Sequence, residues 1–150
     1  MKQIAAPLNG VMRTLADVPD PVFAEGIIGP GFAVEPELGE AVEAVSPISG
    51  TVAKVHPHAF VVVKDGLSVL VHLGIDTVKL NGEGFTVLAT QGDEVEAGQV
   101  MVKWDTQAIS AKGISTICPV VILDTFDPVS PLVEAGQTVH ANQAVAVYGE

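Results

Sequence analysis

Short runs rich in valine and other β-branched or aromatic residues recur along the chain, separated by glycine and proline. Runs of this kind predict β-strands, whereas the helical period in apolar positions is weak throughout. One short helix is expected over 105–112, because Asp105 suits its N-cap and Gly113 suits the position after its end. We expect strands at 50–55, 58–63, 67–73, 85–90, 100–104, 117–123 and 143–148.

The chain also contains a weak internal echo. Residues 6–10 (APLNG) resemble residues 46–50 (SPISG), and residues 89–102 resemble residues 132–147. Two related halves often fold as facing sheets, so the expected fold class is all-β, an antiparallel β-sandwich or flattened barrel with short helical turns. Residues 30–45 are rich in Gly, Pro and Glu and are interpreted as an exposed loop or excursion.

Composition and charge narrow the function. The 150 residues, 48% of them hydrophobic, suit one domain with a buried core, so we expect a single domain over 1–150. The formal net charge of −11 argues against nucleic acid and against an anionic membrane surface, and favours a partner with a basic patch. The single Cys118 excludes an internal disulfide framework. No signal-like or membrane-spanning apolar run is visible, which predicts a cytoplasmic protein.

The stretch 56–85 contains three of the four histidines. If its two β runs are joined by a three-residue turn with Gly66 in the left-handed conformation, paired numbers place His58 directly opposite His72. The two side chains would then share a face, with Cβ atoms roughly 5 Å apart. A two-residue Asp-Gly turn would shift the register by one and place them on opposite faces.

Two facing imidazoles suit two kinds of chemistry. In the first, His72 is a nucleophile toward phosphorus and His58 stabilises the phosphoryl oxygens. In the second, both bind a metal, with His56 or Asp76 as further ligands. The plain alternative is that the histidines cap strands and fill a polar face.

A second surface lies in the segment 18–31, where prolines and glycines rule out a long helix or a central strand. Its apolar residues either pack inward beneath a loop or form an exposed docking patch rimmed by acids. The apolar residues are Val22, Phe23, Ile27 and Ile28, and the acids are Asp20 and Glu25.

Across nearly its whole length the sequence resembles the glucose-type IIA component of the bacterial phosphoenolpyruvate-dependent sugar phosphotransferase system. The block HLGIDTV at 72–78, followed by GEGF at 82–85, is the most specific part of the likeness. The other matching pieces are APLNG at 6–10, VPD at 18–20, VFAE at 22–25, VSP at 45–47, GT at 50–51 and HAF at 58–60.

The resemblance implies an antiparallel β-sandwich of the barrel-sandwich hybrid type and a role as a phosphotransferase. It implies that Nε2 of His72 accepts a phosphoryl group from phosphorylated HPr and passes it to a cysteine on the IIB domain of a glucose- or N-acetylglucosamine-type permease. His58 is then the second active-site histidine, with Asp20 and Asp76 as flanking acids. The residues implied for partner docking are Val22, Phe23, Glu25, Ile27, Ile28, Phe60 and Val78.

One departure concerns His56, which stands where relatives often have Thr two residues before the second histidine. It replaces a hydrogen bond of that Thr, points away, or adds a third imidazole. We expect His56→Ala to weaken transfer less than His58→Ala. No cofactor is expected to be required, although His58 and His72 would suit a zinc ion shared with a partner's carboxylate.

Three other functions compete with this interpretation. The first is a zinc-dependent peptidase-like or zinc-binding β domain that uses His56, His58, His72 and Asp76. The second is a swinging-arm carrier of the biotinyl or lipoyl type, weakened because Lys103 sits within a predicted strand. The third is a regulatory role, in which phosphorylation changes the binding of transporters or enzymes, and it is compatible with the phosphocarrier.

Overall fold

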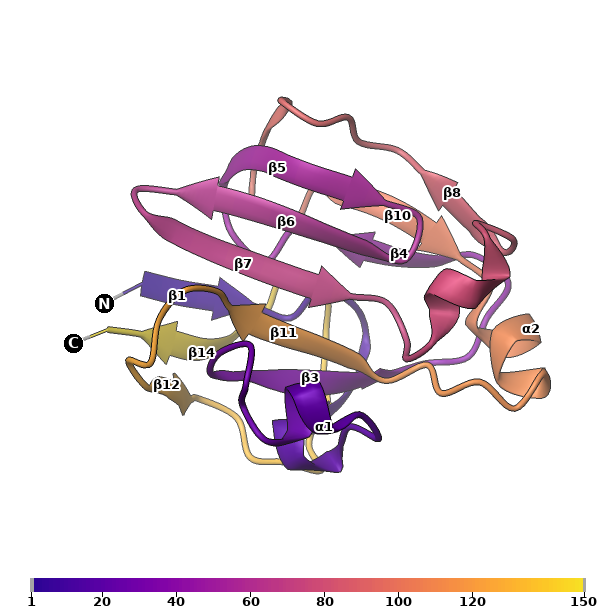
Figure 1. Ribbon diagram of the computed structural model, residues 1–150, viewed down its shortest axis with the longest axis horizontal. Coiled ribbons are helices and arrows are strands. Elements are labelled where there is room, and N and C mark those ends of the chain that lie inside the picture. The colour runs from indigo at the N-terminus through magenta and orange to yellow at the C-terminus, as the bar shows by residue number, and fades with distance from the viewer. Residues whose placement is uncertain (1, 150) are drawn as a thin grey trace.

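The computed structural model describes residues 2–149 and shows three antiparallel sheets with few helices (Figure 1). The large sheet has the order β13 (Thr138–Val139), β2 (Gly10–Arg13), β3 (Gly31–Pro36), β11 (Cys118–Ile122), β7 (Leu67–His72), β6 (Ala59–Lys64), β5 (Gly50–His56) and β9 (Glu94–Val95). One small sheet is β1 (Lys2–Ala5), β14 (Ala144–Tyr148) and β12 (Val129–Pro131). The other is β4 (Val42–Val45), β10 (Val100–Trp104) and β8 (Phe85–Val87).

The expected fold class is confirmed. The main core lies beneath the large sheet, where residues from all three sheets form one buried cluster that includes Phe60, Trp104 and Ile4. Each of the seven predicted strands is present, from β5 to β14, with ends that differ by a few residues. No sheet closes into a barrel within residues 2–149, so the architecture is a sandwich.

The interpretation of residues 30–45 as an exposed loop is wrong. Residues 31–36 form β3, an interior strand of the large sheet, and residues 42–45 form β4. Phe32 and Val34 of β3 point into the main core. Scattered Gly, Pro and Glu residues concealed these strands. In addition, β3 is buried on both faces, because Ala33 is 0% exposed on the face opposite Phe32 and Val34, so this strand lacks the alternation of a half-buried strand.

The internal echo of the sequence is a structural repeat. The strand order of the large sheet is symmetric about the β11–β7 pair: β13, β2 and β3 on one side correspond to β9, β5 and β6 on the other. Each small sheet belongs to one of these halves. Equivalent hydrogen bonds occur within the two halves: the Ala6 amide donates to the Gln143 carbonyl at 2.8 Å in one, and the Ser46 amide donates to the Gln99 carbonyl at 2.9 Å in the other. The fold is therefore built from two similar units.

The two units differ in what connects their strands. In one, β5 and β6 are joined by the two-residue turn at 57–58. In the other, β2 and β3 are separated by the excursion 14–30, which contains the helices η1 (Leu15–Asp17) and α1 (Pro21–Ala24). This excursion packs on the outer face of the large sheet, where Phe23 joins a second, smaller buried cluster with Val121 of β11.

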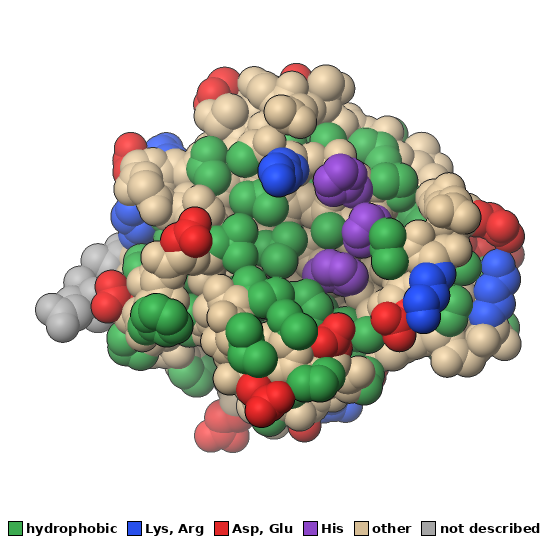
Figure 2. Space-filling view, in the orientation of Figure 1, with side chains coloured by type: hydrophobic (Ala, Val, Ile, Leu, Met, Phe, Trp, Pro, Cys, Tyr) green, Lys and Arg blue, Asp and Glu red, His purple; other side chains and the backbone are tan. Residues whose placement is uncertain are grey.

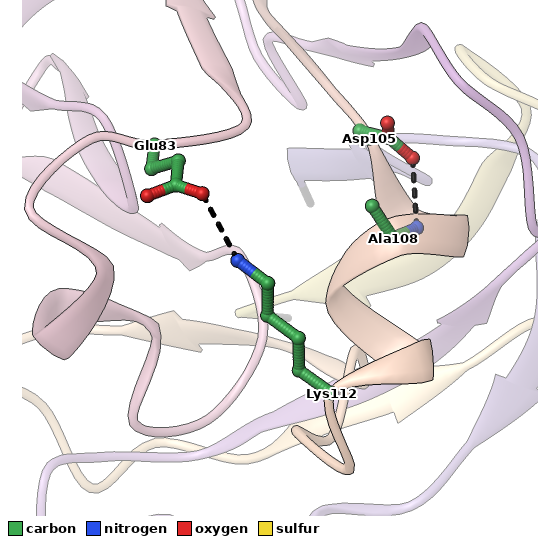
Figure 3. A network of polar contacts seen from close by, with 4 residues as sticks. All are labelled: Glu83, Asp105, Ala108 and Lys112. Carbon is green, nitrogen blue, oxygen red and sulfur yellow. Dashed lines mark hydrogen bonds and ion pairs between the residues drawn. The ribbon is translucent and has the colours of Figure 1, made fainter.

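The short helices follow local sequence signals. The predicted helix is present as α2 (Thr106–Ala111), and the Asp105 side chain caps it by accepting a hydrogen bond from the Ala108 amide at 2.8 Å. Lys112, just after the helix, forms an ion pair with Glu83 at 3.1 Å, which ties α2 to the loop before β8 (Figure 3). A further 3-10 helix, η2 (Thr77–Leu80), follows β7.

Candidate active site

Three histidines lie together at one end of the β5–β6–β7 hairpins. His56 is the last residue of β5, His58 lies in the turn before β6, and His72 is the last residue of β7. Figure 2 shows histidine side chains in a row on this face, among hydrophobic side chains and with acidic groups nearby. The strand ends therefore bring together the residues that the sequence singled out.

The rings of this row contact one another closely. The ring centroids of His58 and His72 lie 5.3 Å apart in an edge-on arrangement, with 68° between the planes. On the other side of His72, the ring of Phe23 lies 5.3 Å away, tilted by 59°. His56 stacks on His58 at 5.8 Å with 22° between the planes. His72 thus lies between the imidazole of His58 and the aromatic ring of Phe23.

The predicted register of the hairpin is wrong, although the predicted proximity of the histidines is correct. The β6–β7 turn has two residues, Asp65 and Gly66, so His72 pairs with Ala59 instead of His58. His58 precedes the strand, so the alternation of faces does not apply to it. Its backbone carbonyl accepts a hydrogen bond from the amide of Leu73 at 2.7 Å, which fixes the turn beside the end of β7.

A backbone contact determines which nitrogen of His72 is free. Nδ1 of His72 lies 2.6 Å from the carbonyl oxygen of Gly74. A carbonyl oxygen only accepts hydrogen bonds, so in the neutral ring Nδ1 carries the proton and Nε2 keeps its lone pair. A Cβ at Gly74 would lie 2.6 Å from Cγ2 of Thr77, and its φ of 81° suits glycine. The sequence reasoning gave Gly74 no role, although its position two residues after His72 was a usable signal.

The surroundings of the histidines favour their neutral forms. Burial lowers the pKa of His72, opposed by the Gly74 hydrogen bond and by the charges of Asp20 and Asp76. Burial also lowers the pKa of His58, and the neighbouring imidazoles of His72 and His56 lower it further. Near neutral pH both rings are therefore uncharged, and Nε2 of His72 is available to attack an electrophile.

The flanking acids come from two different elements. Asp20 is the N-cap of α1, and its carboxylate accepts a hydrogen bond from the amide of Val22 at 3.0 Å. Asp76 is exposed and adopts a left-handed conformation with φ of 64° directly before η2. Both carboxylates are close enough to affect the titration of His72, so the structure brings Asp20 and Asp76 to the same site as the histidine.

The two interpretations of segment 18–31 each describe part of it. Val22 and Ile27 are 42% and 65% exposed, and Val78 beyond β7 is 55% exposed. Phe23 instead packs inward, and Ile28 is half-buried against the same cluster. The exposed apolar side chains and the exposed Glu25, which is the C-cap of α1, lie in the same segments as Phe23, Asp20 and Asp76, which approach His72.

The expectation that Phe60 forms part of the docking rim is wrong. Phe60 is 0% exposed and belongs to the main core. It points into the core because it pairs with Val71 in the row of β6–β7 next to the one that contains Ala59 and His72. Its place directly after His58-Ala59 in the sequence gave no sign of this change of face.

The geometry of the site gives little support to the metal-binding alternatives. Across residues 2–149, no group of three or more His, Cys, Asp and Glu side chains is arranged to hold a metal ion. The stack of His56 on His58 separates their ring centroids by 5.8 Å.

The swinging-arm alternative is also unsupported, because Lys103 lies within β10 and pairs with Glu43 at 3.8 Å.

Comparison with known proteins identifies the family of the chain. The family model of the phosphoenolpyruvate-dependent sugar phosphotransferase system, EIIA 1, matches residues 2–128. The chain belongs to this family. It is 46% identical over 125 residues to the glucose-specific EIIA component of Staphylococcus aureus (strain COL), covering 81% of this chain and 74% of the relative.

Two further relatives show the range of the EIIA family. The chain is 40% identical over 136 residues to the β-glucoside-specific EIIBCA component of Bacillus subtilis (strain 168), covering 86% of this chain and 22% of that longer protein. The solved structure of glucose permease IIA from Mycoplasma capricolum matches with a TM-score of 0.84 and 33% identity, covering 97% and 94% of the two chains. The EIIA protein described here is therefore a phosphotransferase with a role in sugar uptake through this system.

None of the helices that the structure describes has the length and hydrophobicity needed to span a lipid bilayer.

Proposed function

We propose that residues 1–150 of this EIIA protein form a single phosphocarrier domain, in which Nε2 of His72 receives a phosphoryl group from phospho-HPr and passes it to a cysteine of a IIB domain. The observation that carries the proposal is the hydrogen bond from Nδ1 of His72 to the carbonyl of Gly74, which leaves Nε2 free. The proposed place of action is the cytoplasm, and the proposed permease is of the glucose or N-acetylglucosamine type.

The transfer consists of two displacements at phosphorus. In the first, the lone pair on Nε2 of His72 forms the new P–N bond while the bond from phosphorus to the donor breaks and its electron pair leaves with the donor. In the second, a thiolate on IIB forms a P–S bond, the P–N bond breaks, and the electron pair returns to His72. Positioning and charge stabilisation dominate such a loose transition state.

His58 is proposed to stabilise the phosphoryl group in both steps. Its ring meets His72 edge-on, so an N–H of the neutral imidazole is available to an oxygen of the phosphoryl group. Asp20 and Asp76 are proposed to pair with cations on the donor, in keeping with the net charge of −11. Val22, Ile27 and Val78 supply the apolar surface that serves two partners in turn, with Phe23 and Ile28 supporting it from below.

No cofactor is required for this chemistry, because the donor brings the phosphoryl group. A zinc ion shared by His58, His72 and a partner's carboxylate is compatible with the exposed edge of the pair, and a regulatory role that depends on phosphorylation is compatible with the same surface. Both follow from the resemblance and depend on partners.

The decisive experiment is phosphorylation by phosphoenolpyruvate, Enzyme I and HPr, read by intact mass. The wild-type protein should gain one acid-labile phosphoryl group, and His72→Ala should gain none. His140→Ala is the matched control, because this exposed histidine lies outside the site and should leave the modification unchanged. If wild-type protein gains no mass while HPr is shown to be phosphorylated, the proposal is wrong.

A further inference from the structure

Ala59 lies between two histidines in one row across the sheet. It pairs with His56 on β5 and with His72 on β7. Side chains paired side by side point to the same face of a sheet, and the next row, which contains Phe60, faces the core. His56, Ala59 and His72 therefore project together from the outer face.

The small side chain of Ala59 leaves a slot between its neighbours. Neighbouring strands lie about 4.8 Å apart, so the backbones of His56 and His72 are separated by about 10 Å, enough for one more ring. His58 supplies that ring from the adjoining turn, with centroids 5.8 Å from His56 and 5.3 Å from His72. Ala59 is only 8% exposed at the bottom of this arrangement.

Ring contacts define how His58 is oriented. Within residues 2–149 its imidazole makes no hydrogen bond to another protein group, unlike that of His72. The backbone of the turn is held by the His58 carbonyl, which accepts a hydrogen bond from the Leu73 amide at 2.7 Å. With the backbone fixed in this way, the stacked ring of His56 is the group that prevents the His58 side chain from rotating away from His72.

We propose that His56 is a positioning residue of the phosphoryl transfer, which with Ala59 as the floor of the slot holds His58 edge-on to His72. This inference rests on the proposed function, because it acts through the contact of His58 with the phosphoryl group. His56 does not itself touch the reacting atoms. Its side chain works through shape and stacking, so a ring of another chemistry serves in its place.

A double-mutant cycle tests this role. The rate of the relay from phospho-HPr to IIB should fall about tenfold in His56→Ala, since small displacements of a catalytic group are costly. His56→Phe should recover most of the rate, because it keeps a ring against His58. In a His58→Ala background, adding His56→Ala should cost nothing further. His140→Ala is the control for loss of an exposed histidine.

Several outcomes would overturn the inference. These are a wild-type rate in His56→Ala, no recovery in His56→Phe, or an equal loss from His56→Ala with and without His58. Ala59→Val, which fills the slot from below, should also slow the relay, provided that its melting temperature shows a folded protein. Phosphorylation of wild-type His72 is read in parallel, so a failure of the proposed function is distinguished from a failure of the inference alone.

Discussion

The imidazole of His58 meets that of His72 edge-on, with 5.3 Å between ring centroids and 68° between ring planes. The contact joins a turn residue to the end of a strand, and the bond from the Leu73 amide to the His58 carbonyl fixes it. An N–H donor beside the nucleophile can stabilise the negative charge of the phosphoryl oxygens during transfer.

Removing the imidazole of His58 should slow phosphoryl transfer without changing which residue is phosphorylated. We expect His58→Ala to lower the rate of the relay from phospho-HPr to IIB by about a hundredfold, which is typical for loss of one donor to a developing anion. His72 should still be the modified residue, as peptide mapping by mass under alkaline conditions will show. An unchanged rate would assign His58 a purely structural role.

Gly74 is expected to be the most sensitive glycine of the site. Gly74→Ala should lower the free energy of unfolding by about 1–3 kcal/mol, because a Cβ at φ of 81° would also lie 2.6 Å from Thr77 and 2.9 Å from the carbonyl oxygen of Ser115. Gly66→Ala is a matched control with the same φ of 81° and nothing within 4 Å. It should cost about 1 kcal/mol, from backbone strain alone. Equal losses in urea denaturation would show that steric contact at Gly74 is unimportant.

The strands with regular alternation were well predicted from the sequence, whereas the local geometry of the site was not. β6 and β7 have strong β-branched runs, so their existence was clear, but the turn between them depends on one residue of register. Asp65 adopts φ of 50° and Gly66 φ of 81°, which gives the two-residue turn. Sequence spacing alone did not discriminate between that turn and a three-residue one.

Phe23 and Phe60 show why the docking surface was only partly predictable. Both are apolar residues close to polar site residues in the sequence, and both were expected at the surface. Phe23 turns inward because the excursion 14–30 lies on the outer face of the large sheet, a tertiary packing that no local pattern encodes. Phe60 turns inward because its neighbour Ala59 occupies the outer face.

The stability of the protein should depend on pH through the site histidines. Burial lowers the folded-state pKa of His72 and His58 from the ordinary value of 6.5, so the unfolded chain takes up protons first as the pH falls. Their contribution to stability is present in full above about pH 6.5 and is lost as the pH falls toward the folded-state pKa values. The urea midpoint should therefore drop between pH 7.5 and 5.5.

The variant His72→Gln separates this effect from that of the carboxylates. It removes one lowered pKa and also removes the neighbour that lowers the pKa of His58, so the pH dependence of the urea midpoint should become shallower. All other residues are the same in the two proteins, so the difference between their pH dependences reports the histidine pair. An identical or steeper dependence in His72→Gln would contradict the assignment.

The apolar border of the site should control recognition rather than chemistry. Ile27 is 65% exposed beside the buried Phe23, so Ile27→Ser removes contact area for a partner while leaving the core intact. We expect the KM for phospho-HPr to rise about tenfold with kcat little changed, the signature of lost uniform binding. Leu132→Ser is the matched control, because Leu132 is 54% exposed and follows β12, whose sheet contains none of the strands that carry the site histidines. A similar KM in both variants would show that the surface around Ile27 does not bind the donor, whereas a fall in kcat alone would show that Ile27 supports the histidines and not the partner.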